Sequence, residues 1–348
     1  MFLRSLSIEN FRSLRSAELH FDDNTILIGE NDCGKSSLFE ALAKALAVGD
    51  GAPYFEAQHF HRAQGGPSTS PAGPIRLQLT FEERKAGEWD KIELGVLQPL
   101  LKKTDTRPRQ LVLRLKAHVP EGNETVEARW NIFSPGMKHN ADELPALERL
   151  RALNRFVWLR GGSLFSPGRN RDPRPDAERP FTADIAPLAE EIEKRYQALV
   201  SGTSRHERSE IKAGYEAALE LLARRAVEAH SAGALSGSLV EEILNQRGLD
   251  AGQRAQAFHG SAAQQIGVLI LTAAFLRHHP GVPFSGTEFI MILEDPEAHL
   301  HLMTLASVWG LVDQIKSQKI ICTQSGNLLA TAPLHGIRRI TRHAGEIR

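Results

Sequence analysis

The chain has 348 residues, enough for one large core with an inserted or appended element. Its 42 Lys and Arg residues balance 42 Asp and Glu residues, so bulk charge points neither to nucleic acid nor to an anionic membrane. The longest apolar run, residues 266–276, is too short to span a bilayer, and the N-terminus lacks the apolar core of a signal peptide. Because only Cys33 and Cys322 are present, we expect free thiols and a cytoplasmic protein without membrane segments.

The first half of the chain is predicted to be rich in strands. Alternating apolar residues predict two strands near the N-terminus, and the short apolar run at 25–28 leads into a helix that begins at Ser36. Further strands are predicted at 75–81, 110–119, 126–133 and 156–159, with a helix near 88–103.

An arginine-rich segment follows this β-rich part. Between Arg151 and Arg179 there are seven Arg residues together with many Gly and Pro residues, which predicts a loop with local positive charge. The loop is the best internal candidate for contact with a nucleic-acid phosphate backbone. The alternative is a solvated loop without a partner.

The second half of the chain is predicted to be helical and then α/β. Two apolar stripes within 184–246 predict an antiparallel helical insertion, which could form a two-fold interface with a second chain or pack against its own domain. After it, helices are predicted at 258–279 and 302–316, and buried strands at 289–293 and 319–323.

A phosphate-binding loop is predicted between the strand at 25–28 and the helix that follows. Residues 29–36 read GENDCGKS, in which Gly29 and Gly34 let the backbone N–H groups face a β-phosphate. Lys35 would neutralise the β and γ oxygens, and Ser36 would offer its hydroxyl to Mg²⁺ at a helix N-terminus. A glycine-rich turn that merely starts a helix would not require Lys35 and Ser36 together, so the sequence predicts binding of ATP with Mg²⁺.

A buried strand ending in acids supplies the second half of such a site. The segment FIMILEDPEAHLH places Glu294 and Asp295 at the strand end, where Glu294 would support the metal and Asp295 would polarise the attacking water. The alternative is a strand capped by solvated acids. His299 and His301 could form a metal site with Glu297, but turn and interface roles are favoured for them because further ligands are missing.

Four segments together resemble a known family: LRSLSIENFRSL, ILIGENDCGKSSLFEAL, ILEDPEAHLH and KIICTQSGNLL. Their order resembles the ABC-type heads of the SMC and RecF superfamily, and most of all the ATPase region of OLD (overcoming lysogenization defect) proteins. The resemblance implies an α/β fold class, an ABC-type P-loop ATPase head with a β-rich lobe and an inserted helical dimerisation element. Residues 1–183 and 247–348 would form the head, and residues 184–246 the insertion.

The resemblance also assigns site residues. It implies nucleotide contact by Arg12, a phosphate cradle and a signature-loop serine within GSAAQ (260–264), where alanines replace the family's glycines. Gln324 stands where the family has a histidine that senses the γ-phosphate. Its amide can form a hydrogen bond but cannot carry charge, so slow hydrolysis is expected. The cradle, signature and sensing residues are Asn31, Asp32, Cys33, Gly34, Lys35, Ser36, Ser37, Ser261 and Gln324.

These motifs predict an ATP-binding, slowly hydrolysing ATPase domain of an OLD-type DNA-processing or antiphage protein. The resemblance implies a homodimer, with DNA, a nuclease domain or chain and a helicase as candidate partners. No Asp-x-Asp pair of a Toprim nuclease occurs in the sequence, so we expect no DNA cleavage by this chain. The alternative function is a nucleotide-dependent interaction module that assembles on ATP binding but hardly turns over.

Overall fold

The fold is taken from a computed structural model. It describes residues 1–30, 33–46, 52–62, 73–101, 107–120, 125–160, 163–165, 185–201, 288–297, 317–331, 334–343 and 346–347, together with parts of 205–219, 266–270 and 300–313. Within these residues, no helix combines the length and the apolar character that crossing a membrane requires.

An antiparallel sheet forms one side of the molecule. Its strand order is β2-β1-β4-β5-β6-β7, and one face is buried because apolar residues alternate with polar ones along each long strand. The strands predicted from alternation in this region are therefore confirmed. Their bounds are β1 (Phe2–Phe11), β2 (Leu14–His20), β4 (Ile75–Glu82), β5 (Gln110–His118), β6 (Glu127–Phe133) and β7 (Asn140–Ala141).

A second sheet, mostly parallel, carries the two predicted motifs. Its order is β12-β3-β11-β10-β8-β9, and every pairing except β8 with β9 is parallel. The register aligns Leu27, Cys322 and Glu294 across β3, β11 and β10, so these strands end at the same edge. The bounds are β3 (Asn24–Ile28), β8 (Asn154–Arg160), β9 (Ser163–Phe165), β10 (Glu288–Glu294), β11 (Gln318–Cys322) and β12 (Ile337–Arg339).

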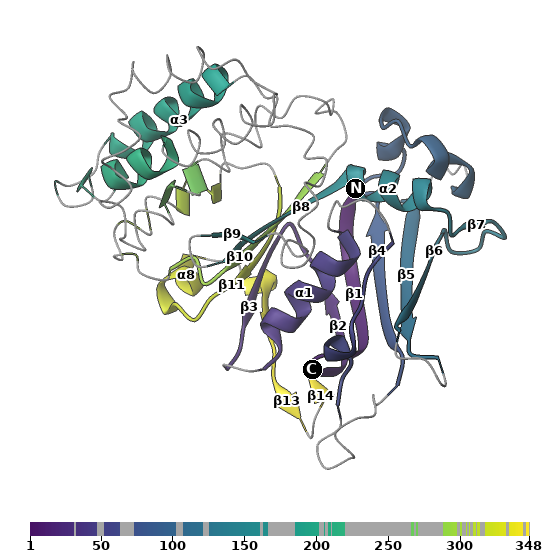
Figure 1. The fold of residues 1–348 in the computed structure, drawn as a ribbon. Helices are drawn as coiled ribbons and strands as arrows, with labels where there is room; N and C mark the ends of the chain where they lie inside the picture. The colour runs from purple at the N-terminus through teal and green to yellow at the C-terminus, as the bar shows by residue number, and fades with distance from the viewer. Residues whose placement is uncertain are drawn as a thin grey trace.

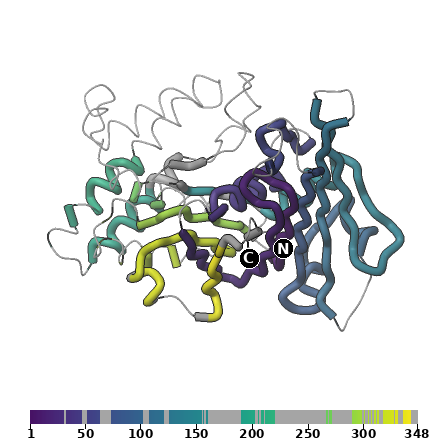
Figure 2. The backbone as a smooth tube through the Cα atoms, turned by 90° about the horizontal axis from the view of Figure 1, so that it is seen from below, coloured from purple at the N-terminus to yellow at the C-terminus, as the bar shows by residue number. Residues whose placement is uncertain are grey.

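Helix α1 (Lys35–Leu46) lies between the two sheets (Figures 1 and 2), and eight of its 12 residues are buried. Helix α1 follows β3 through the loop at 29–34, which confirms the predicted order of strand, loop and helix. The remaining elements are α2 (Leu144–Leu153), α3 (Ile185–Val200), α8 (Gly326–Thr331), the 3-10 helices η1 (Ala57–His59), η2 (Glu88–Lys91), η3 (Gly95–Leu100) and η4 (Leu334–Gly336), and the small pair β13 (Arg342–His343) and β14 (Glu346–Ile347).

Two predictions for the middle of the chain are wrong. The helix expected near 88–103 is split into η2 and η3, because Ile92 is extended and Gly95 has a φ of 57°. Pro99, inside η3, lacks the backbone N–H that a longer helix would use. The first part of the Arg-rich segment, residues 151–160, is not loop but the last turn of α2 followed by β8, which confirms the strand expected at 156–159. Arg151 is buried and donates from Nε to the carbonyl oxygen of Ala45, 3.1 Å away, so it cannot contact a phosphate backbone. Residues 166–184 lie outside the described chain.

The helices expected at the start of 184–246 are present, whereas residues 220–246 lie outside the described residues. Helix α3 runs beside helical residues 211–219, and the ring of Tyr196 stacks on that of Tyr215 with centroids 4.4 Å apart. Ile192 and Ile211, from the two predicted apolar stripes, are fully buried. Ile192 and Ile211 are therefore covered within their own chain, and the two-fold interface stays a prediction for the rest of the stripes.

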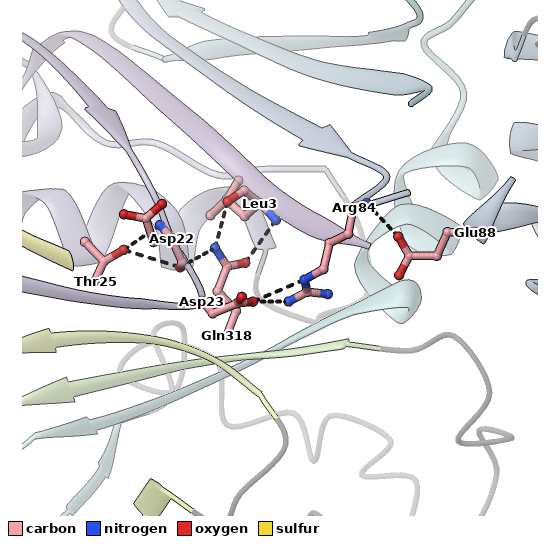
Figure 3. A network of polar contacts seen from close by, with 7 residues as sticks. All are labelled: Leu3, Asp22, Asp23, Thr25, Arg84, Glu88 and Gln318. Atoms are coloured by element: carbon pink, nitrogen blue, oxygen red, sulfur yellow. Dashed lines mark hydrogen bonds and ion pairs between the residues drawn. The ribbon is translucent and has the colours of Figure 1, made fainter. Parts of the chain in front are cut away.

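Gln318 joins the two sheets through buried hydrogen bonds (Figure 3). Its Oε1 accepts the backbone N–H of Leu3 at 2.9 Å, and its Nε2 donates to the carbonyl oxygens of Leu3 at 2.7 Å and Asp22 at 3.3 Å. Nearby, Arg84 from the end of β4 pairs with Asp23, which precedes β3. Since Gln318 is completely buried, no water replaces these bonds.

We predict that Gln318→Ala lowers the free energy of unfolding by roughly 3 kcal/mol, because the buried backbone groups of Leu3 lose their partners. Urea unfolding followed by circular dichroism measures the change. Gln78→Ala, on the outward face of β4, is the control and should change stability by less than about 0.5 kcal/mol. Equal losses in the two variants would contradict the inter-sheet role.

Candidate functional site: a phosphate loop beside an acidic strand end

The glycines of the predicted phosphate loop are required by the local backbone. Gly34 has a φ of 100°, a left-handed conformation that favours glycine. A Cβ on Gly29 would lie 2.7 Å from the carbonyl oxygen of Ile340 and 2.8 Å from Sγ of Cys33. The loop therefore leaves β3 in a space that a side chain would fill, beside the end of β12.

Lys35 extends along the inside of this loop. Its Nζ donates to the carbonyl oxygens of Gly29 and Glu30, both at 2.7 Å, and lies 3.7 Å from Sγ of Cys33. The residue is buried, and α1 begins with it, the N–H of Leu38 donating to the carbonyl oxygen of Gly34. A buried ammonium and the positive end of a helix dipole thus meet at one loop, which favours an anionic ligand.

The acid at the end of β10 contacts the first turn of α1. Ser36 Oγ donates to Oε1 of Glu294 at 2.6 Å, although 258 residues separate the two in sequence. The other oxygen, Oε2, accepts from the indole Nε1 of Trp158 on β8 at 3.2 Å. Glu294 is only 6% exposed, so these donors stabilise a carboxylate that solvent hardly reaches.

Asp295 follows at the turn after β10. Its φ of 48° lies in the left-handed region, and its N–H donates to the carbonyl oxygen of Cys322 at 3.0 Å. Burial and the Asp295 carboxylate raise the pKa of the Cys322 thiol to about 12, an effect that the Lys35 ammonium partly opposes. Cys322 is therefore a neutral thiol at pH 7, and both cysteines are free and buried, as predicted.

Glu297 connects the acidic turn, residues 295–297 after β10, to the segment after β11. Its Oε1 accepts the hydroxyl of Thr323 at 2.6 Å and the backbone N–H groups of Gln324 and Ser325 at 2.9 and 3.1 Å. The N–H of Ser325 also donates to Thr323 Oγ1, at 2.9 Å. Gln324 thus lies at the same edge of the sheet as the phosphate loop, and its side chain is exposed.

The turn between β1 and β2 approaches α1. Arg12, with a φ of 50°, donates its N–H to the carbonyl oxygen of His59 at 2.8 Å, and its guanidinium pairs with Glu40 on α1. Burial lowers the pKa of His59 to about 4, so the ring contacts Glu40 as a neutral imidazole. The hydroxyls of Ser13 and Ser37 lie 2.8 Å apart, which connects this turn to the start of α1.

The predicted site residues are thus partly brought together. Lys35, Ser36, Glu294 and Asp295 share the strand-end edge, and Gln324 lies there too. The predicted residues Asn31, Asp32 and Ser261, and also His299 and His301, lie outside the described residues. Where the structure describes the chain, no group of three or more His, Cys, Asp or Glu side chains could hold a metal ion.

The sequence does not predict the contacts of four residues in this region: Ser13, Glu40, Trp158 and Glu297. A buried Trp needs a partner for its N–H, which is a signal for Trp158, but the sequence does not say which acid supplies it. Glu297 was considered only as a metal ligand, although its place after Asp295 and a Pro signals a turn residue.

The fold defines a structural class, that of SMC head domains. An SMC head bound to the C-winged helix domain of ScpA covers 100% of this chain and 97% of its own, with a TM-score of 0.57 and 12% identity. A Smc head with an extended coiled coil, bound to the C-terminal domain of ScpA and derived from Pyrococcus furiosus, covers 100% and 95%, with a TM-score of 0.51 and 16% identity. At such identities the likeness shows the fold alone.

The chain belongs to the family DUF2813, described as a protein of unknown function, whose family model matches residues 1–348. It is also similar to the uncharacterized protein YbjD of Escherichia coli K12, with 23% identity over 353 residues. That match takes in 100% of this chain but 63% of YbjD, so the chain spans under two thirds of its relative's length.

We predict that Trp158→Phe raises the Mg²⁺ concentration needed for half-maximal ATP binding by about tenfold, because Oε2 of Glu294 loses the indole N–H while a smaller aromatic side chain still fills most of the space. Titration of Mg²⁺ at fixed fluorescent ATP analogue measures it. Trp89→Phe is the matched control, since Trp89 is equally buried and its Nε1 has no hydrogen-bond partner. The same Mg²⁺ requirement in both variants would contradict this contact's role.

Proposed function

We propose that this chain binds ATP with Mg²⁺ and hydrolyses it slowly. The observation that carries the proposal is the hydrogen bond between Ser36, at the N-terminus of α1, and Glu294, at the end of β10. A hydroxyl and a carboxylate in contact are oxygen ligands of the kind that Mg²⁺ takes, and Lys35 is bound in the adjoining glycine loop.

Each residue has a distinct part in this proposal. The loop N–H groups and Lys35 bind the β and γ phosphates, while Ser36 and Glu294 hold the metal, which supplies charge neutralisation. Asp295 accepts a hydrogen bond from the water that attacks the γ-phosphorus, and the bond from that phosphorus to the β–γ bridging oxygen breaks. Arg12 adds a cation from the β1–β2 turn. Two features of this edge fit ATP with Mg²⁺: the loop around Gly29 and Gly34, which has no room for a side chain at Gly29, and the oxygen atoms of Ser36 and Glu294, which could bind the metal.

Slow turnover is part of the proposal because two residues depart from the ABC pattern. Gln324 stands where a histidine would sense the γ-phosphate, and a neutral amide cannot carry charge there. The signature segment has alanines in place of glycines. These departures also support the second candidate, an interaction module that assembles on ATP binding with hardly any turnover.

The wider biological setting is proposed from the OLD-like motifs. We infer a homodimer that encloses ATP between two chains, and a role in DNA processing or antiphage defence alongside a nuclease or helicase. The motif order LRSLSIENFRSL, GENDCGKS, EDPEAHLH and TQSGN supports this proposal. Arg151 adds nothing to DNA contact, because it is buried against α1.

We predict that Lys35→Ala weakens ATP binding by at least about tenfold, or about 1.4 kcal/mol, because the loop loses its ammonium. Isothermal titration calorimetry with ATP and Mg²⁺ measures the dissociation constant. Lys85→Ala, in the turn after β4, is the charge-matched control and should bind ATP as the wild type does. Wild-type affinity in Lys35→Ala would refute the nucleotide site.

Turnover separates the ATPase from the interaction module. We predict that the purified chain releases phosphate slowly from ATP and that Asp295→Ala lowers the rate at least about tenfold while still binding ATP. Phosphate release and solution mass are measured in parallel, with and without ATP. A mass increase on ATP with no wild-type phosphate release would select the interaction module instead.

A further inference from the structure

Glu297 concentrates its hydrogen bonds on one oxygen. Oε1 takes the three donors of the turn Thr323–Ser325, whereas Oε2 is buried and has no hydrogen-bond partner. A carboxylate accepts N–H and O–H donors more strongly than a neutral group does. Such an arrangement is costly to build, since a buried oxygen remains unpaired, and it fixes one particular turn of the chain.

The turn Thr323–Ser325 follows β11 directly and lies beside the end of β3 and the turn after β10. Thr323 is fully buried and its N–H donates to the carbonyl oxygen of Leu27, the residue just before the end of β3. Asp295, two residues before Glu297, binds the backbone of Cys322 in the same way. Asp295 and Glu297 therefore bind four successive residues, 322–325, beside the phosphate loop.

We propose that Glu297 is a positioning residue for ATP hydrolysis, which fixes the backbone of Gln324 at the γ-phosphate end of the site. This inference rests on the proposed ATPase function. Glu297 acts through Gln324 and Asp295 rather than on the nucleotide, so its loss slows turnover and leaves ATP binding to Lys35 and the glycine loop.

A metal-ligand role for Glu297 is less compatible with the geometry. A cation at Oε1 would face three donors that already point their hydrogens at that oxygen, and it would have to displace them. Oε2 is buried, and among the described residues no group of three or more His, Cys, Asp or Glu side chains could hold a metal ion beside it. A merely structural role is also distinguishable. It would lower stability without separating the rate of turnover from the affinity for ATP.

The test compares Glu297→Ala and Glu297→Gln with Thr323→Val and with the control Glu127→Gln on the exposed part of β6. Glu297→Gln keeps one oxygen for the turn but places an NH₂ at the buried, unpaired position of Oε2. Thr323→Val keeps the shape of the side chain and removes one donor. Glu297→Gln and Thr323→Val keep the inference testable if Glu297→Ala fails to fold.

Three quantities are measured: kcat by phosphate release, the ATP dissociation constant by calorimetry, and amide hydrogen exchange of a peptide covering 323–326. We expect Glu297→Ala to lower kcat and to speed exchange by about tenfold each, with ATP affinity changed less than about threefold. Glu297→Gln and Thr323→Val should show smaller changes in the same direction, and Glu127→Gln none.

Wild-type kcat in both Glu297 variants would overturn the inference and leave the ATPase proposal intact. A loss of ATP affinity as large as the loss of kcat would also overturn it, because Glu297 would then act on binding. Absence of phosphate release from the wild type would overturn the ATPase proposal itself, and with it this inference. Unchanged exchange at 323–326 in Glu297→Ala would show that the turn does not depend on Glu297.

Discussion

The parallel register of β3, β11 and β10 is the constraint on which the site depends. These strands are buried, and a shift of one residue would send each side chain to the opposite face of the sheet. The register therefore fixes Leu27, Cys322 and Glu294 in one row, and the three loops that follow them start at one edge. Chain segments nearly 300 residues apart thereby supply one set of polar groups.

At this edge of the sheet, the contacts of buried charged groups contribute more to the free energy of folding than those of exposed ones. Glu294 and Lys35 are both charged groups with little exposure, and each is compensated by donors or acceptors that the fold delivers: Ser36 and Trp158 for the acid, loop carbonyls for the base. Solvent-exposed pairs on the antiparallel sheet, such as Arg76 with Glu9, carry much less energy. The site is therefore more tightly constrained than the surface around it.

Local patterns predicted most strands and the phosphate loop, because alternation and the GxxxxGKS spacing are properties of short segments. The same reasoning failed at 88–103, where apolar residues suggested one helix but the chain is extended at Ile92 and left-handed at Gly95. It also missed α2, in which Pro145 marks the first turn. The partners of Trp158 and Glu297 could not be predicted, because they depend on strand register between segments that are 136 and 26 residues away.

Helix α1 is fastened at both ends. Ser37 is bonded to the β1–β2 turn near its start, and the buried Arg151 of α2 binds the carbonyl oxygen of Ala45 near its end. Burial lowers the pKa of Arg151 to about 10, so the guanidinium remains charged at pH 7 and favours the negative pole of the helix. The helix has 12 residues and is about 18 Å long, so the contact with α2 lies one helix length from the phosphate loop. A displacement of α1 along its axis would therefore act on the hydrogen bond between Ala45 and Arg151 as well as on the loop.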